Sequence, residues 1–415
     1  MNARHAPPPA RLEARIDLDA LRSNVRRLRE IAGPAAVMAV VKADAYGHGM
    51  VPCARAALEA GAGWIGTALP EEALALRAAG IEARILTWLH APGDDFAALL
   101  RAGVDVSVSG QWALHAVLDA VEETGVPARI QLKADTGLGR NGVQPHDWPT
   151  VVEEAAKAER AELLKVTGVW SHFACADEPG HPSIRRQLTA YHEALDAALA
   201  AGLRPEVRHL ANSPATLTLP ESRFDLVRPG IAMYGLSPSP EVGTPGDFGL
   251  RPVMSLVARL ASVKRVPAGH GVSYGHTYHT GEETRLALVP AGYADGVPRA
   301  ASSAAPVSIG GRRHVIAGRV AMDQFVVDLG PAVAGEPEPA PGDEAVLFGP
   351  GDGGTPTAED WAQAVGTIGY EIVTRVGPRV PRVYTGTQAV AAAPGAGRAT
   401  AERPADPADG PARNA

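Results

Sequence analysis

The sequence VVKADAYGHG occupies residues 40–49, where an apolar run ends in a single lysine and a glycine-containing loop. The run from Ala35 to Val41 is partly β-branched, which is typical of a buried strand. Lys42 follows at its end. A lysine after a strand is usually just exposed, but buried lysines need a partner or a chemical role. A desolvated amine with a lowered pKa acts as a Schiff-base nucleophile.

The same unit, a short apolar run followed by an Ala- and Leu-rich helical segment, recurs along the chain. Several helical segments end in glycine, as in LEAG at 58–61, where glycine supplies a left-handed cap. Strands are predicted at 36–41, 64–68, 84–88, 104–108, 129–134, 165–173, 207–211 and 226–234. Eight strands alternating with helices predict an α/β fold, a parallel (β/α)8 TIM-like barrel. The alternative is an open doubly wound sheet, but no GxGxxG follows the first strand.

The sequence pattern changes at a Pro- and Gly-rich linker near 236–250, and after it the predicted segments are strands and no longer mainly helices. Strands are predicted at 253–266, 284–291, 305–309, 314–320, 324–329 and 344–348, with one helix at 357–365. We therefore predict a barrel domain at 11–245 and a mostly-β domain at 246–385. The composition of 1–10 and 386–415 predicts disordered tails.

Composition excludes several classes of protein. The chain has 415 residues, 46% of them hydrophobic, and a net charge of −7, which argues against a nucleic-acid partner. No apolar segment is long enough to span a bilayer. The first ten residues lack the apolar core of a signal peptide, so we expect a cytoplasmic protein. Cys53 and Cys175 are far apart, which predicts neither a disulfide framework nor a metal site.

Polar side chains gather at the predicted strand ends, which form the working face of a barrel. They are Lys42, Lys133, Asp135, Arg140, His172, Asn212, Ser213, Arg228 and Gly230. Each alone has a structural explanation, such as a core histidine, an ion-pair partner or a helix cap at Ser213 before Pro214. Their convergence on one face favours a catalytic site.

The segments after the last two strands suit a phosphate group. Asn212-Ser213-Pro214-Ala215 is predicted to open a short helix, and Gly230 lets backbone amides approach closely. Barrels commonly bind phosphates at this position. A Schiff-base lysine together with a phosphate site suggests pyridoxal 5′-phosphate as the cofactor.

At this point the chain resembles the alanine racemase family from about residue 12 to 385. The motifs are VVKADAYGHG (40–49), LKADTGLGRNG (132–142), SHFACAD (171–177), HLANSPA (209–215), VRPGIAMYG (227–235), GVSYGHTY (271–278), AGYADG (291–296), GRVAMDQ (318–324) and TIGYE (367–371). The resemblance implies a homodimer with head-to-tail, shared sites. It also implies interconversion of L- and D-alanine by two bases, supplying D-alanine for peptidoglycan.

The resemblance also implies roles for single residues. Lys42 would carry the cofactor and act as one base, and Tyr274 would be the second base. His172 would link Tyr274 to Arg228, which would face the pyridine nitrogen. The remaining cofactor contacts would be Tyr46, Asn212, Ser213, Gly230, Ile231 and Tyr370. The substrate contacts would be Arg140, Met322, Lys133, at a position often carbamylated, and Tyr293, which would line the entrance with Asp177, Arg299 and Arg319.

The sequence departs from the family pattern at Ala321, His276 and Thr87-Trp88, none of which removes a catalytic group. Two functions other than racemisation are compared with the sequence. Related barrel decarboxylases carry an acidic residue at the pyridine nitrogen, and Arg228 speaks against them. A cofactor carrier would consist of the barrel alone, and the β domain with GVSYG speaks against that.

Overall fold

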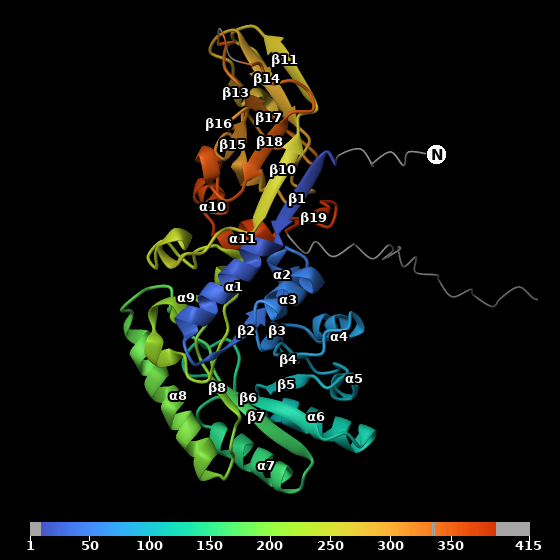
Figure 1. The fold of residues 1–415 in the computed structure, drawn as a ribbon, viewed down its shortest axis with the longest axis vertical. Coiled ribbons are helices and arrows are strands. Elements are labelled where there is room, and N and C mark those ends of the chain that lie inside the picture. The colour runs from blue at the N-terminus through green and yellow to red at the C-terminus, as the bar shows by residue number, and fades with distance from the viewer. Residues whose placement is uncertain (1–9, 334, 336, 387–415) are drawn as a thin grey trace, which may run out of the picture.

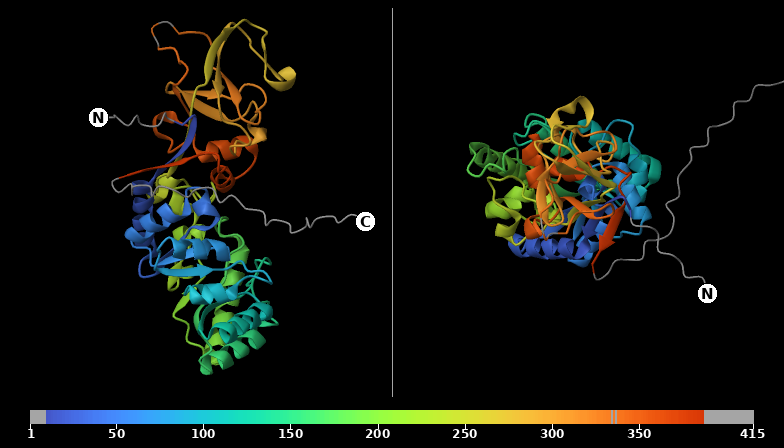
Figure 2. Two further views of the ribbon diagram at one scale, coloured as in Figure 1. Left: turned by 90° about the vertical axis from the view of Figure 1, so that its right-hand side faces the viewer. Right: turned by 90° about the horizontal axis from the view of Figure 1, so that it is seen from above.

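The computed structural model describes residues 10–333, 335 and 337–386, which form two domains stacked along the long axis of the molecule (Figure 1). The barrel forms one end and the second domain the other, as the left-hand view of Figure 2 also shows. The tails predicted at 1–10 and 386–415 lie outside the described residues, except for positions 10 and 386. None of the helices in the described part of the chain is long and apolar enough to cross a bilayer.

Eight parallel strands form the barrel in the order β8-β7-β6-β5-β4-β3-β2-β9. Their bounds are β2 Ala36–Val40, β3 Trp64–Thr67, β4 Arg84–Thr87, β5 Asp105–Val108, β6 Ala128–Lys133, β7 Leu164–Trp170, β8 Val207–His209 and β9 Leu226–Val227. The ring nearly closes between its two end strands. There the Asp225 amide donates to Arg208 O at 3.1 Å, and the Arg228 amide donates to Ala211 O at 3.0 Å. The predicted parallel barrel is confirmed, and the open sheet is excluded.

Two predicted strands are shorter than expected. The strand predicted at 226–234 ends at Val227, because Pro229 lacks the amide hydrogen that a strand ladder needs. A short 3₁₀ helix, η2 (Ile231–Tyr234), follows instead. The strand predicted at 165–173 ends at Trp170, so His172 lies in the loop beyond the strand and not within it.

Helices cover the outside of the ring. They are α1 Leu18–Ala32, α3 Met50–Glu59, α4 Pro70–Ala78, α5 Phe96–Arg101, α6 Gln111–Thr124, α7 Trp148–Arg160, α8 Pro182–Ala200 and α9 Ser213–Thr218. Asp17 caps the start of α1, since its carboxylate accepts hydrogen bonds from the amides of Asp19 and Ala20 at 3.0 Å each. α6 ends at Gly125, whose φ of 66° is the left-handed cap that the sequence predicted.

The end of the barrel where the strands begin is closed by a buried ion cluster. Asp105 is fully buried at the start of β5, and its two oxygens lie 2.6 Å from Arg84 and 2.7 Å from Arg129. The Thr167 hydroxyl donates to the same carboxylate at 2.8 Å. Both oxygens of this buried charge thus accept from at least one donor, as burial of a carboxylate requires. The candidate active site lies at the opposite end of the barrel, where the strands finish.

The second domain contains a six-stranded sheet in the order β16-β15-β18-β10-β1-β19 and a three-stranded sheet in the order β11-β14-β17. The bounds are β1 Leu12–Asp17, β10 Met254–Arg259, β11 Ser262–Val266, β14 Thr284–Val289, β15 Pro306–Ile309, β16 Arg312–Val315, β17 Phe325–Asp328, β18 Glu344–Phe348 and β19 Arg382–Thr385. A small hairpin pairs β12 (Gly271–Val272) with β13 (Tyr278–His279). Gly310 and Gly311 form the turn that joins β15 to β16.

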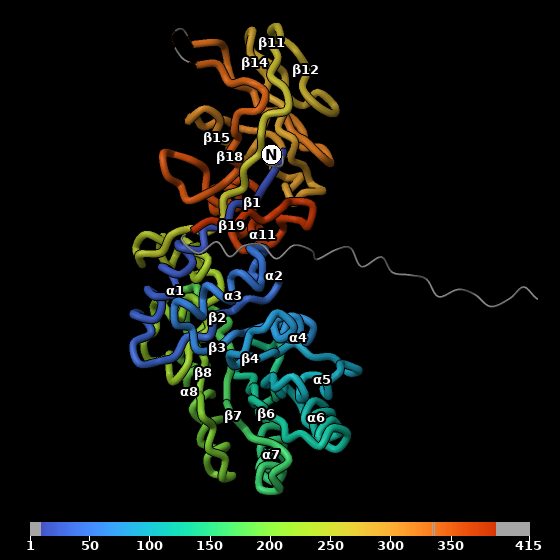
Figure 3. Tube along the Cα trace, turned by 45° about the vertical axis from the view of Figure 1, so that its right-hand side comes forward, coloured from blue at the N-terminus to red at the C-terminus, as the bar shows by residue number. Residues whose placement is uncertain are grey.

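Strand β1 comes from the N-terminal side of the barrel, a position that the sequence analysis did not foresee. It pairs antiparallel with β10 and parallel with β19. The described part of the domain also has α10 (Ala358–Val365), which Thr357 caps and which matches the helix predicted at 357–365, and α11 (Gly369–Thr374). α11 packs against α2 (Lys42–Tyr46), so the second domain contacts the segment that carries Lys42 (Figure 3).

Candidate active site

Lys42 stands at the first position of a strained turn. The next four residues, Ala43 to Tyr46, have φ values of 52°, 52°, 56° and 53°, so the backbone is left-handed where no glycine is present. Each such residue costs ~1–2 kcal/mol relative to the right-handed form. Strain of this kind persists only where the surroundings impose it, and it gathers at functional sites. The loop predicted after Lys42 is therefore a built feature of the site.

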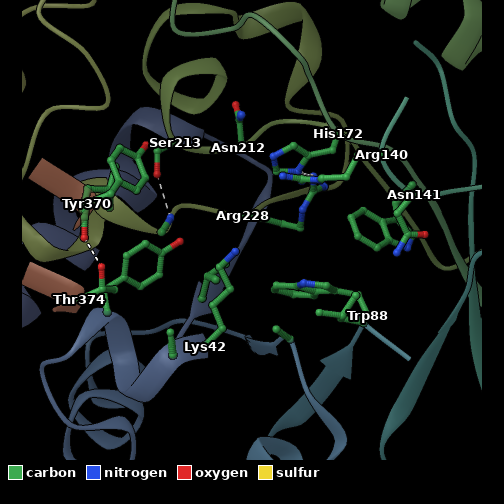
Figure 4. Close-up of a pocket in the computed structure, with 18 of the residues that line it drawn as sticks. Lys42, Trp88, Arg140, Asn141, His172, Asn212, Ser213, Arg228, Tyr370 and Thr374 are labelled. Atoms are coloured by element: carbon green, nitrogen blue, oxygen red, sulfur yellow. Dashed lines mark hydrogen bonds between the residues drawn. The ribbon is translucent and has the colours of Figure 1, made fainter. Parts of the chain in front are cut away.

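A cavity of about 580 Å³ opens at the strand ends beside Lys42 (Figure 4). Its lining includes the predicted residues Lys42, Tyr46, Lys133, Arg140, His172, Asn212, Ser213, Arg228, Gly230, Ile231 and Tyr370. The sequence analysis assigned no role to Trp88, Asn141, Trp170 and Thr374, which also line it. The structure thus gathers the barrel residues of the predicted site, together with Tyr370 from α11, around one cavity.

Two lysines lie in this cavity, and both are disfavoured as ammonium ions. Burial lowers the pKa of Lys42, and the charge of Arg140 lowers it further. Burial and the same arginine lower the pKa of Lys133 to about 7. The Lys133 ammonium lies 4.5 Å from the centre of the Trp170 ring, which offers it a cation–π contact. The neutral amine is the nucleophilic form of a lysine, and burial shifts Lys42 towards that form.

Arg228 is buried and held from several sides. One guanidinium nitrogen donates to the carbonyls of Ser171 at 2.7 Å and Leu210 at 3.0 Å, and lies 3.3 Å from His172 Nδ1. Its guanidinium carbon stacks 4.8 Å from the Trp170 ring centre. A guanidinium only donates hydrogen bonds. The side of Arg228 that faces the cavity therefore offers donors to whatever binds there.

His209 is the partner of Arg228 that the sequence analysis missed. Its Nδ1 lies 2.9 Å from the second guanidinium nitrogen, and its Nε2 lies 2.7 Å from Gln131 Oε1. Burial, and then the charge of Arg228, push the pKa of His209 far below its usual range. The ring is thus neutral, with Nε2–H donating to Gln131 and Nδ1 accepting from Arg228. Its signal was a fully buried histidine at the end of β8, the strand next to the Arg228 segment.

The opposite side of the cavity suits an anion. Ser213 Oγ accepts from the Gly230 amide at 2.8 Å and from the Ala232 amide at 3.4 Å. A Cβ at Gly230 would come within 2.2 Å of Tyr46 Oη, so only glycine fits this cradle. Asn212, and not Ser213 as predicted, caps α9, because its side-chain oxygen accepts from the Ala215 amide at 3.3 Å.

Three predicted residues of the second domain do not line this cavity within one chain. Tyr274, Met322 and Tyr293 are 71%, 53% and 41% exposed. Backbone bonds from Tyr293 and Ala294 to Ala321 and Met322 join two of them into one surface region. The predicted link from Tyr274 through His172 to Arg228 therefore does not form in one chain, although His172 itself lies beside Arg228. Of the predicted entrance residues, Asp177 lines a neighbouring cavity together with Arg140.

Two family models match the chain over nearly all of its described length. The model "Alanine racemase, N-terminal domain" matches residues 16–238, and "Alanine racemase, C-terminal domain" matches residues 253–384. The chain belongs to the alanine racemase family. It is therefore grouped with isomerases, as the resemblance predicted.

Individual alanine racemases agree with this assignment. The alanine racemase of Streptomyces coelicolor is 66% identical, over 92% of this chain and 97% of its own length. The crystal structure of alanine racemase from D-cycloserine-producing Streptomyces lavendulae is 64% identical, covers 91% of this chain and 98% of that chain, and gives a TM-score of 0.89. The Bacillus anthracis alanine racemase with bound L-Ala-P is 36% identical, covers 92% of this chain and 97% of that chain, and gives a TM-score of 0.83.

Proposed function

We propose that the chain interconverts L-alanine and D-alanine by a two-base mechanism that depends on pyridoxal 5′-phosphate. The observation that carries the proposal is one cavity that combines three features. These are the desolvated Lys42 amine, the hydrogen-bond donors of Arg228 and the glycine cradle at Gly230. An electrophilic aldehyde, a ring nitrogen and a phosphate need these three kinds of partner.

The residues of the cavity fit the cofactor. Lys42 would hold it covalently, and Arg228 would donate to the pyridine nitrogen. The phosphate would be held by Tyr46, Ser213, Gly230, Ile231 and Tyr370, with Asn212 and His172 completing the cofactor contacts. Because Arg228 donates and cannot accept, it disfavours a proton on the nitrogen that it faces. His209 and Gln131 fix the orientation of that guanidinium.

Bound pyridoxal phosphate withdraws electrons from the substrate Cα and makes its proton removable. Racemisation then needs a base on each face of Cα, because one base that cannot cross the plane returns the proton to the same face. Lys42 would serve one face through its amine. Tyr274 would serve the other through its phenol. Arg140, Lys133, Met322 and Tyr293 would position the substrate and bound its side chain.

The exposure of the second-domain residues supports a shared site. Tyr274 and Met322 are exposed on the second domain, and neither is among the described residues that line the barrel cavity. In a head-to-tail homodimer, the second domain of one copy would meet the barrel of the other. Each site would then take Lys42 from one chain and Tyr274 from its partner. We further propose a cytoplasmic enzyme that supplies D-alanine for cell-wall peptidoglycan.

Chiral chromatography tests the proposed reaction. Purified protein supplied with pyridoxal phosphate and L-alanine should form D-alanine until the two isomers are equal. The same preparation should release no carbon dioxide from lysine or arginine, because Arg228 replaces the acid that the decarboxylases use. Carbon dioxide release without D-alanine would overturn the proposal. Parallel reactions with serine and lysine measure substrate breadth.

A further inference from the structure

A buried histidine supports the strained turn after Lys42 without lining the cavity. We propose that His48 is a positioning residue, whose imidazole holds the left-handed backbone at Ala45 and Tyr46 and so directs Lys42 and Tyr46 into the cavity. This inference rests on the proposed function, in which Lys42 and Tyr46 hold the cofactor. It assigns a role to the histidine of VVKADAYGHG, which the site itself does not use.

The contacts of His48 determine its protonation. Nδ1 lies 3.0 Å from Ala45 O and 2.9 Å from Tyr46 O. Carbonyl oxygens only accept, so Nδ1 carries the hydrogen and donates to both. Nε2 is buried and has no hydrogen-bond partner among the described residues. Burial lowers the pKa of His48 to about 4, so the ring is neutral, with Nδ1–H, at physiological pH.

The ring of His48 is itself fixed by an aromatic neighbour. It stacks on Tyr234, with ring centres 4.4 Å apart and an angle of 26° between the planes. The Tyr234 hydroxyl donates to Val40 O at 2.9 Å, and its ring lies 5.0 Å from that of Tyr46. The backbone before Lys42 and the backbone after it are thus tied to the same pair of rings.

The other side of the turn is held by an acid. Glu72 on α4 accepts from the Ala43 amide at 2.6 Å. Its second oxygen accepts from the amides of Ala68 and Leu69 at 2.9 Å and 3.1 Å. Glu72 therefore fixes the start of the turn, and His48 fixes its end. A left-handed run without glycine needs such external bonds, because its own sequence favours right-handed conformations.

Two substitutions separate the hydrogen bond from the bulk of the ring. His48→Asn keeps an amide N–H close to the position of Nδ1, and His48→Leu keeps apolar volume but cannot donate. Leu114→Ala, in the buried face of α6, is a matched control for loss of stability away from the turn. The readout is the dissociation constant of pyridoxal phosphate for cofactor-free protein, with kcat and KM measured on the loaded enzyme.

We expect His48→Leu to weaken cofactor binding by roughly tenfold or more, because two carbonyls lose their buried donor. His48→Asn should stay within about threefold of the wild type, since one donor is retained. Leu114→Ala should lower the melting temperature and leave the dissociation constant unchanged. Wild-type cofactor affinity in folded His48→Leu would overturn the inference. So would an equal loss in His48→Asn and His48→Leu.

A measurement on the unaltered protein covers the case in which His48→Leu does not fold. Nitrogen-15 NMR of labelled histidine should show His48 as the neutral Nδ1–H form between pH 6 and 8, with or without cofactor. An Nε2–H or charged ring would refute the inference. Failure of the proposed function is seen separately, because the wild-type chain would then fail to bind pyridoxal phosphate or to racemise alanine.

Discussion

The cavity of the barrel and the exposed surface around Tyr274 differ in how much of their chemistry one chain completes. In the barrel, Arg228 is buried and bonded to carbonyls and histidines, and Lys42 stands on a backbone turn fixed from both sides. On the second domain, Tyr274 is 71% exposed and Met322 is 53% exposed. Buried polar groups need their partners inside the chain, whereas exposed ones can meet them on another molecule.

This difference shows which part of the proposed site already has its geometry within one chain. The barrel cavity is assembled within one chain, because its lining comes from the barrel and from α11 of the same chain. The second-domain half is a surface whose proposed role begins only on contact with another barrel. Large exposed apolar side chains grouped on one surface commonly mark such contacts. Five experiments break or sharpen this comparison, beginning with the one of largest expected effect.

Lys42→Ala removes the lysine amine from the barrel cavity. We expect loss of detectable racemisation and of the absorbance of bound pyridoxal phosphate, because no other amine is placed to react in the same way. The melting temperature should change little, since the side chain lies at the cavity and not in the core. Borohydride reduction followed by peptide mass spectrometry checks the assignment, and a cofactor adduct on another lysine would contradict it.

Tyr274→Phe removes only the phenol of the second-domain half. Loss of a general base typically lowers kcat by ~10²–10⁴-fold. Cofactor binding should persist, because the barrel half is intact. In deuterated water, the variant should exchange the α-hydrogen of D-alanine faster than that of L-alanine, since Lys42 remains to serve one face.

Mixing the two inactive variants tests whether sites are shared. If each site takes Lys42 and Tyr274 from different chains, a mixed dimer holds one intact site and one doubly altered site. A statistical mixture should then recover about one quarter of wild-type activity, from symmetry alone. Sites built within single chains would recover nothing, and that result would remove the proposed dimer.

Arg228→Lys keeps the charge and removes the fork of donors. A lysine cannot bond His209 and the two backbone carbonyls together, so acceptors would be left unsatisfied at ~1–3 kcal/mol each. We expect a lower melting temperature and an activity reduced by about tenfold or more, in line with that energy. Arg208→Lys is the control, because its ion pair with Asp225 is far more exposed. Equal effects of the two substitutions would show that the buried hydrogen bonds of Arg228 do not set it apart from Arg208.

Lys133→Met has the smallest expected effect, on the pH dependence of stability. The pKa of Lys133 is about 7 in the native state against 10.5 ordinarily, so between these values the unfolded chain binds more protons. The free energy of unfolding therefore gains a term that rises with pH over this window. The variant lacks that term, so its stability advantage over wild type should be greatest below pH 7 and shrink above it.

Urea denaturation in buffers free of carbon dioxide measures the difference. Lys264→Met in the exposed part of β11 is the control, and it should show no pH-dependent difference. A constant difference between Lys133→Met and wild type from pH 6 to 10 would show that Lys133 keeps an ordinary pKa. Adding bicarbonate then asks whether Lys133 forms a carbamate, which would appear as a mass increase in the native protein.

The barrel was predictable because short runs rich in apolar residues alternate with helical segments, and the first run ends at the polar Lys42. The strand β1 was missed, although the buried residues Leu12, Ala14 and Ile16 alternate with partly exposed ones. That period-2 signal was present in the sequence. It was overlooked because its partners, β10 and β19, lie at the far end of the chain.

Other features of the site had weaker signals. Ala-Asp-Ala-Tyr at 43–46 has no local preference for left-handed backbone, so the turn results from contacts that no local pattern contains. His209 was visible as a polar residue in a predicted barrel strand, but its role follows only from the distance to Arg228. The assigned roles of the site residues, and those of Tyr274 and Met322 above all, remain predictions for the experiments above.

The position of β1 between β10 and β19 has a consequence for the order in which the molecule is completed. During synthesis β1 leaves the ribosome first, yet both of its partners are made after the whole barrel. It must therefore wait unpaired while the barrel forms behind it. The last described strand, β19, then pairs with β1. Pairing of strands over so long a sequence separation slows folding. The six-stranded sheet of the second domain therefore cannot be completed before the barrel has been synthesised.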